Sequence, residues 1–170
     1  MKLIQAMKKC QDLAIKANDL RSKIGEHCAD LTLETPAYPD QRKKIDEWLQ
    51  SHSDILKEIL SLRVAIQKTN LATNVTIELG GKQVTKSIAE WIHRRRDLAK
   101  LERDAWAKLG DRGLKEQNVQ TSQGGPVTEI RIRRYFDASE RDTKMELYRS
   151  EPSIIDSTLE VVNATTDLTE

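Results

Sequence analysis

Arginine clusters are the residues of this sequence whose type and spacing point most directly to chemistry. One cluster follows His93, and the other lies in a segment that alternates apolar and polar residues. Guanidinium groups bind phosphate oxygens through paired hydrogen bonds. Consecutive helical residues fan around the helix, however, and acidic residues such as Asp97 offer ordinary ion-pair partners. We favour surface ion pairs or an oligomer interface over a nucleic-acid contact. The candidate phosphate contacts are Arg94, Arg95, Arg96, Arg131, Arg133 and Arg134.

Histidines and cysteines do not converge on a metal or catalytic site in this sequence. His27, His52 and His93 fall in separate predicted helices, and only His27 stands beside a cysteine, Cys28. Neighbouring helical residues point in different directions, so this pair does not readily hold one ion. No glycine-flanked nucleophile is present, and the glycine pairs are too short to cradle a phosphate. We therefore expect no metal, no cofactor and no catalytic residue, and predict that the chain is not an enzyme.

Composition narrows the kind of protein. Charged residues make up 32% of the 170 residues and aromatic residues only 4%, so the core must be aliphatic, as in helical bundles. Lys plus Arg (28) nearly cancels Asp plus Glu (27), which removes the positive field of a dedicated nucleic-acid binder. Cys10 and Cys28 lie about 27 Å apart on one predicted helix and cannot form a disulfide bond with each other. Charge interrupts the first residues before a signal peptide could form, and we expect a cytoplasmic protein without a membrane segment.

Residues 1–32 carry apolar side chains at alternating steps of four and three, which predicts a long helix with a contact stripe. Leu13 and Leu20 widen this stripe, as is typical of a helix inside a bundle. Arg21 occupies the one polar position. The stripe comprises Leu3, Met7, Cys10, Ala14, Ala17, Arg21, Ile24, Cys28 and Leu31.

A second long helix is predicted from residue 40 to residue 69, after a loop that Pro36 and Pro39 impose. Because the connection is short, we expect the two helices to pair antiparallel. The stripe of the second helix comprises Ile45, Trp48, His52, Ile55, Ile59, Leu62 and Ile66. Whether Trp48, Trp91 and Trp106 lie in the core or on a partner surface stays open.

The rest of the chain predicts short strands between further helices. Gly80 and Gly81 join residues 74–79 and 82–85 into a hairpin. Residues 127–133 alternate as a strand does, and we expect this strand to pair with that hairpin after a mobile loop at 116–126. A third helix starts at Ser87 and ends near Gly110. The last helix starts at Asp137, and we expect Pro152 to interrupt or restart it.

Short stretches along nearly the whole chain resemble the septicolysin-like family, small bacterial proteins that carry a domain of unknown function. The stretches are Met1–Met7, Ile66–Thr73, Val84–Asp97 and Asn163–Leu168. Ala164 departs from the pattern, in which tryptophan is expected. The resemblance implies a helical protein with no established activity and no catalytic residues to carry over. The family name suggests a cytolysin, but no stretch here resembles a pore-forming segment.

The sequence thus predicts a mainly α-helical single domain, residues 1–170, with long antiparallel helices and a small β-hairpin or three-stranded element. We expect a non-enzymatic structural or scaffolding protein that forms a homo-oligomer, on its own or within a larger assembly. The alternatives are a nucleic-acid-associated accessory factor that uses the arginine clusters and a virion component of a bacterial virus. Whether the stripes close within one chain or between chains stays open. The candidate interface residues are Met7, Ala14, Ile45, Trp48, Ile55, Ile59, Leu62 and Ile66.

Overall fold

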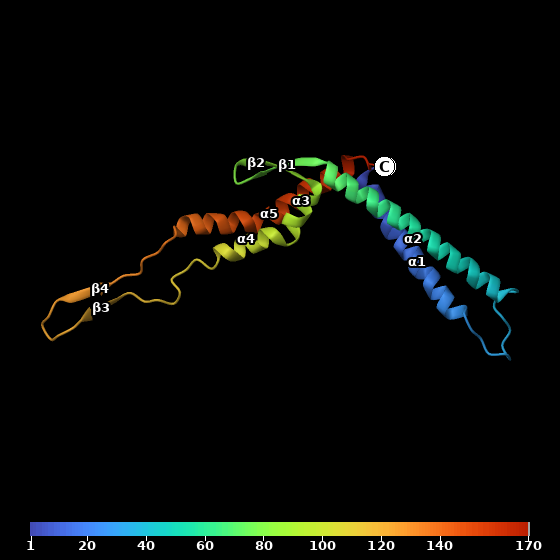
Figure 1. Ribbon diagram of the computed structural model, residues 1–170, viewed down its shortest axis with the longest axis horizontal. Coiled ribbons are helices and arrows are strands. Elements are labelled where there is room, and N and C mark those ends of the chain that lie inside the picture. Colours follow the sequence, from blue (N-terminus) through green and yellow to red (C-terminus); the bar gives the residue numbers. More distant parts are fainter. Residues whose placement is uncertain (170) are drawn as a thin grey trace. The chain divides into compact units, whose positions relative to one another are not determined.

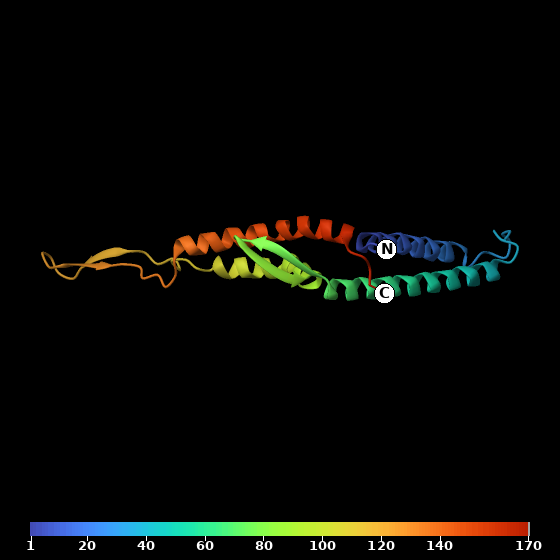
Figure 2. The ribbon, with the colours of Figure 1, turned by 90° about the horizontal axis from the view of Figure 1, so that it is seen from above.

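The fold is mainly α-helical, as predicted. A computed structural model describes residues 1–169, and its contacts divide the chain into two compact units. The first unit contains residues 1–75, 87–89 and those from Leu159 onward, and the second contains residues 76–86 and 90–158. The first unit is built on α1 (Leu3–His27) and α2 (Gln41–Ala72), which lie side by side and antiparallel (Figures 1 and 2). The antiparallel pairing predicted across the proline loop is therefore confirmed.

The contact stripe of α2 lies where the sequence placed it. Trp48, Ile59 and Leu62 are buried, and the other predicted positions are half-buried. The Asp40 side chain accepts a hydrogen bond from the Lys43 amide at 3.0 Å and so caps the start of the helix. Sequence periodicity therefore identified the inner face of α2.

The contact stripe of α1 is displaced from the predicted one at every second position. Ala6 and Leu13 are buried, whereas the predicted Met7 and Ala14 are exposed. Leu3 and Ala17 are buried, as predicted. Each pair of neighbours is similarly apolar, so hydrophobicity alone cannot decide which of the two faces α2. The inner face consists of Leu3, Ala6, Cys10, Leu13, Ala17, Leu20 and Ile24, all buried or half-buried.

Two separate hairpins replace the expected three-stranded element. β1 (Asn74–Leu79) pairs with β2 (Lys82–Ser87), and the tight turn between them uses positive φ angles at Gly80 and Gly81, 57° and 75°. β4 (Val127–Ile130) pairs antiparallel with β3 (Gln117–Gln120) and not with the first hairpin, which corrects our expectation. A nearby partner strand closes a shorter loop at lower entropic cost. The mobility expected of residues 116–126 stays a prediction.

The remaining helices begin close to the predicted residues. α3 (Ile88–His93), the π-helix η1 (Arg94–Leu98) and α4 (Ala99–Trp106) follow one another without a break. α5 (Ala138–Thr165) begins after Asp137, whose side chain accepts hydrogen bonds from the amides of two following residues. The helix runs through Pro152, so the predicted interruption is wrong. Its buried side continues past the proline at Glu151, Ile155 and Leu159, and this packing outweighs one missing hydrogen bond.

Candidate functional site

The α1–α2 pair has two flanks of different chemistry. On one flank, Lys9 forms an ion pair with Glu58 at 2.6 Å, and Lys16 and Lys23 line a groove with Ile55. Long charged side chains cover the helix contact there, so we call it the charged flank. Side chains of this kind shield the edge of a helix pair from further packing.

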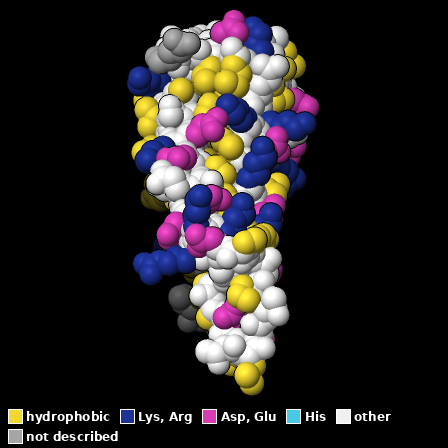
Figure 3. Space-filling model, turned by 90° about the vertical axis from the view of Figure 1, so that its right-hand side faces the viewer, with side chains coloured by type: hydrophobic (Ala, Val, Ile, Leu, Met, Phe, Trp, Pro, Cys, Tyr) yellow, Lys and Arg dark blue, Asp and Glu magenta, His cyan; other side chains and the backbone are white. Residues whose placement is uncertain are grey.

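The opposite flank carries exposed apolar side chains, and we call it the apolar flank. It comprises Ile4, Met7, Ala14, Leu49, Leu56 and Leu60, which recur at helical spacing along the two helices. Ala14 and Leu56 line one shallow groove of about 300 Å³ between α1 and α2. The five large side chains are 41–63% exposed. Hydrophobic side chains also lie between charged ones on the face of the molecule in Figure 3.

Two charged residues line the groove of the apolar flank beside its apolar residues. Arg21 and Arg63 line its groove together with the uncharged Asn18. Arg21 Nη2 donates a hydrogen bond to Asn18 Oδ1 at 2.6 Å.

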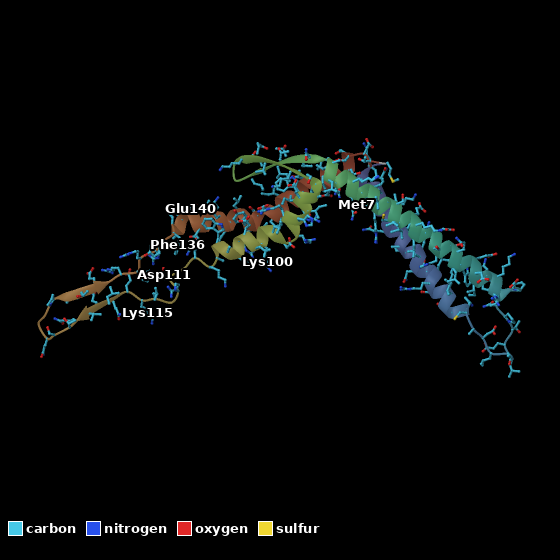
Figure 4. The ribbon with its side chains drawn as sticks, in the orientation of Figure 1. Met7, Lys100, Asp111, Lys115, Phe136 and Glu140 are labelled. Carbon is cyan, nitrogen blue, oxygen red and sulfur yellow. The ribbon has the colours of Figure 1, made fainter. Side chains whose placement is uncertain are left out.

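Most of the predicted interface residues face α1 within the same chain. Trp48, Ile59 and Leu62 are buried, and Ile45, Ile55 and Ile66 are half-buried. Met7 and Ala14 lie outside, on the apolar flank (Figure 4 labels Met7). Sequence reasoning missed the other four residues of the flank, although they form a second apolar stripe offset from the first: Ile4, Leu49, Leu56 and Leu60.

The first arginine cluster is engaged with carboxylates. Arg94 donates two hydrogen bonds of 2.7 Å to Glu151, which is only 2% exposed, and a third of 3.2 Å to Glu102. The hydrogen bonds to Glu151 raise the pKa of Arg94 above its usual range. Arg95 pairs with Asp156 and Arg96 with Asp97. Carboxylates of the same chain therefore already accept the hydrogen bonds that a phosphate would need from these guanidinium groups.

The second arginine cluster borders the segments that lead to β3 and β4. Arg134 forms a bidentate pair with Asp111 at 2.6 and 2.7 Å, and Arg131 bonds Glu116 and Glu129. The hydrogen bonds from Arg134 hold the pKa of Asp111 below its usual range. Asp111 and Phe136 lie on the two segments that join α4 and α5 to the second hairpin (Figure 4).

An open cavity of about 290 Å³ lies beside the second arginine cluster. Its basic residues include Lys108, Arg112 and Arg133, and Phe136 contributes an aromatic wall. Arg133 and Arg134 both line this cavity, whereas Arg131 does not, and the guanidinium groups of Arg131 and Arg134 form the ion pairs described above.

The next feature is the surroundings of His27 and of the two cysteines. The His27 ring centroid lies 5.6 Å from those of Tyr38 and Trp48 at the loop end of the hairpin. Cys10 packs partly buried against the α1–α2 core, and Cys28 is exposed. Within residues 1–169, no three or more His, Cys, Asp or Glu side chains are grouped closely enough to hold a metal ion. Over the same residues, no helix combines the length and the apolar character needed to cross a membrane.

The tryptophans are divided between burial and partial exposure. Trp91 is fully buried and Trp48 is 8% exposed, whereas Trp106 is half-buried. Trp48 and Trp91 therefore belong to the interior of the chain.

Comparison with known proteins gives a family and a fold without an activity. A family model whose description is a family of unknown function matches residues 10–168. A crystal structure described as a functionally unknown conserved protein from Corynebacterium diphtheriae aligns over 99% of both chains, with a TM-score of 0.59 and 19% identity. At that identity the likeness concerns the fold alone. No curated protein matches the chain.

Proposed function

Because the chain belongs to the family of unknown function DUF6847, which supplies no activity, we propose from its structure that it is a non-enzymatic structural protein whose helical hairpins self-associate. The contact between copies is the apolar flank. One observation carries the proposal: the α1–α2 pair closes its own core and still leaves large apolar side chains along one side. Apolar side chains that recur along one side of a helix pair differ from the singly scattered hydrophobic residues of ordinary surfaces.

A second copy of the chain is the partner that the apolar flank fits best. Leu49 to Leu60 span about 16 Å of α2, and Ile4 to Ala14 span a similar length of α1. Two such flanks related by a twofold axis bring the apolar residues of one copy against those of the other, as in an isologous interface. The product is a four-helix bundle, in which helices pack near antiparallel around an aliphatic core.

The experiment is a measurement of molar mass by light scattering behind size exclusion. The wild-type chain is expected at a multiple of its formula mass. A variant with Met7→Asp and Leu56→Asp places charges at the centre of the apolar flank, so we expect it to lose that contact and fall in mass at least twofold. Far-UV circular dichroism should show that its helices remain.

Leu33→Asp is the matched control, because Leu33 is 98% exposed in the loop between the helices. This variant should keep the wild-type mass. A wild-type chain that stays monomeric at every concentration, or a double variant with unchanged mass, would contradict the proposal.

The finer features of the proposal concern lineage and location. We propose that the protein is related to the septicolysin-like proteins, on the stretches quoted above, and that its assembly lies in the cytoplasm or, if a bacterial virus encodes it, in the virion. A nucleic-acid-associated role remains the alternative. It is less well supported, because Arg94, Arg95, Arg96, Arg131 and Arg134 are bonded to carboxylates of the same chain.

A further inference from the structure

The cavity beside the second arginine cluster carries more positive charge than the chain neutralises. It measures about 290 Å³ and lies within the second unit, between the segment that follows α4 and the segment that precedes α5. We call it the basic cavity. Figure 4 labels one residue from each of these two walls, Asp111 and Phe136.

Three cations that line the basic cavity have no acidic partner. Within residues 1–169, the side chains of Lys108, Arg112 and Arg133 form no ion pair and no hydrogen bond. The acidic residue of the lining is Asp111, and Arg134 already bonds both of its carboxylate oxygens. Every other arginine of the second unit forms an ion pair with a carboxylate. The unpaired positive charges of this unit's arginines are therefore gathered at the basic cavity.

Polar contacts hold the two walls of the basic cavity together. The bidentate pair of Arg134 with Asp111 joins one wall to the other at 2.6 and 2.7 Å. From α5, Arg141 Nη1 donates a hydrogen bond of 3.0 Å to the Leu109 carbonyl, and the same guanidinium lies 5.7 Å from the centre of the Phe136 ring. The walls are thus fixed before a ligand arrives, which lowers the ordering cost of binding.

The backbone holds Arg112 in a conformation that arginine seldom adopts. Its φ is 55°, that of Gly113 is 73°, and the Leu114 amide donates to the Asp111 carbonyl at 2.8 Å. These features describe a tight turn in which glycine, asparagine or aspartate is the common residue at the position of Arg112. Strain of this kind concentrates at ligand-binding sites, and here it accompanies a cation of the cavity lining.

An aromatic side chain accompanies these cations. Tyr135 belongs to the lining and is 88% exposed, and its ring has no stacking or hydrogen-bond partner in the part of the chain that the structure describes. Guanidinium groups bind phosphate oxygens through paired hydrogen bonds, and nucleic-acid bases of every kind stack on aromatic rings. The lining therefore offers both kinds of contact that a nucleotide needs.

We propose that the basic cavity binds a nucleoside diphosphate. The phosphate groups bond Lys108, Arg112 and Arg133, and the base stacks on the Tyr135 ring. A terminal phosphate ester carries nearly two negative charges at neutral pH, and a second phosphate adds to them, so a diphosphate balances the three cations. The cavity is near the lower end of the range for small-ligand pockets, about 300–1,000 Å³, and so suits a single nucleotide.

A nucleic-acid strand fits the basic cavity less well than one nucleotide does. Proteins that hold a single strand use a positively charged groove that follows the backbone from one phosphate to the next. Beyond the basic cavity, the arginines of the second unit are paired with carboxylates and do not continue such a groove.

Isothermal titration calorimetry with ADP tests the proposal. The buffer contains EDTA, so that side chains and not a metal ion must hold the phosphates, and we expect one ADP per chain. Lys108→Gln with Arg133→Gln should raise the Kd about tenfold or more, because charge-assisted hydrogen bonds are lost. Lys115→Gln is the matched control, since Lys115 is an exposed lysine of the same segment outside the lining, and it should leave the Kd nearly unchanged.

The stacking contact has its own measurement. Tyr135→Ala should raise the Kd for ADP about tenfold and leave the Kd for pyrophosphate unchanged, because pyrophosphate has no ring. Tyr135→Phe keeps the ring and should retain the affinity for ADP. Thermal unfolding followed by circular dichroism should show the same midpoint in all these variants, because the side chains replaced have no partner within the described residues.

Several outcomes would overturn the proposal. One is a wild-type chain that does not bind ADP at millimolar concentration, and another is an equal loss of affinity in Lys115→Gln and the double variant. Pyrophosphate that binds as tightly as ADP would leave a site for anions without a place for the base. An oligothymidylate strand that binds more tightly than ADP, and loses affinity in the same variants, would favour the nucleic-acid role instead.

Binding of ADP is separate from the proposed self-association. Met7→Asp with Leu56→Asp lies in the first unit and should bind ADP as the wild-type chain does. The failure of either proposal therefore leaves the other standing.

Discussion

At the scale of single residues, Arg94 and Glu151 form an ion pair that has little access to water. Glu151 is 2% exposed, and both of its carboxylate oxygens accept hydrogen bonds from Arg94. The Arg94 guanidinium also lies 5.8 Å from the ring of Tyr148. Arg94 follows His93 directly, at the start of the π-helix, and local π-helical turns of this kind reorient a side chain relative to a regular helix. The sequence suggested a phosphate contact at Arg94 because a guanidinium group binds a phosphate and a carboxylate equally well in geometry.

Removing the Arg94 side chain should leave a buried carboxylate without its counter-charge. We expect Arg94→Ala to lower the free energy of unfolding by about 3 kcal/mol, as is typical when one partner of a buried ion pair is removed. Arg96→Ala is the control, because Arg96 is exposed and its partner Asp97 is only half-buried, and it should cost less than about 1 kcal/mol. Urea unfolding followed by circular dichroism measures both values. Equal losses of unfolding free energy in the two variants would show that the Arg94–Glu151 pair stabilises the fold no more than the Arg96–Asp97 pair does.

At the scale of elements, α2 has two faces that a pair of substitutions can distinguish. Ile59 is 6% exposed in the contact with α1, and Leu56, one helical turn earlier, is 48% exposed on the apolar flank. We expect Ile59→Asp to lower the free energy of unfolding by more than about 3 kcal/mol, because it buries a carboxylate without a partner. Leu56→Asp should change it by less than about 1 kcal/mol in the dissociated chain. Denaturant unfolding at low protein concentration makes the comparison, and similar losses would mean that the two faces are not distinct.

The periodicity of apolar residues predicted where the helices lie, but it predicted less well which face of each helix packs against the other. Trp48, Ile59 and Leu62 are buried on the face that the alternating steps of three and four residues predicted for α2. On α1, Ala6 and Met7 are both apolar, so the sequence could not say which of them faces the partner helix. Only the position of α2 in space decides this.

The short strands exposed a different limit of sequence reasoning. Residues 117–120 are polar except for Val119, so nothing in their pattern marks them as a strand. Their strand conformation comes from pairing with residues 127–130. The apolar flank was missed for a similar reason, since residues such as Leu49 and Leu60 differ from core residues only in what the fold leaves uncovered.

At the scale of the whole molecule, the end of the described chain returns to its beginning. Lys2 Nζ bonds Asp167 at 2.9 Å and the Thr165 carbonyl at 2.8 Å, and the Leu168 amide donates to the Met1 carbonyl at 2.8 Å. The Thr169 amide donates to Thr69 Oγ1 at 2.9 Å, and Leu168 packs on the core between α1 and α2. The last residues thus contact both helices of the hairpin.

The ion pair of Lys2 and Asp167 should make this contact sensitive to pH. The hydrogen bond and the charge of Lys2 lower the pKa of Asp167. A carboxyl whose pKa is lower in the folded chain stabilises it above the unfolded pKa of about 3.9, and this contribution disappears as the pH falls through the folded value. Asp167→Asn should therefore lower stability near neutral pH and have little effect below about pH 2. Thermal unfolding across this range measures it, with Asp19→Asn as the control, and a loss that is the same at both ends of the range would contradict the assignment.

The contacts of the last described residues with the first hairpin also determine the order in which this unit can fold during translation. Residues 1–75, which supply both helices of the hairpin, leave the ribosome long before residues 165–169 are made. The helices can pair at once, because their contacts are close in sequence and such contacts form fast. The contacts of residues 165–169 with Lys2 and Thr69 form only after nearly a hundred further residues have been added. The first hairpin can therefore assemble in the nascent chain before these contacts exist.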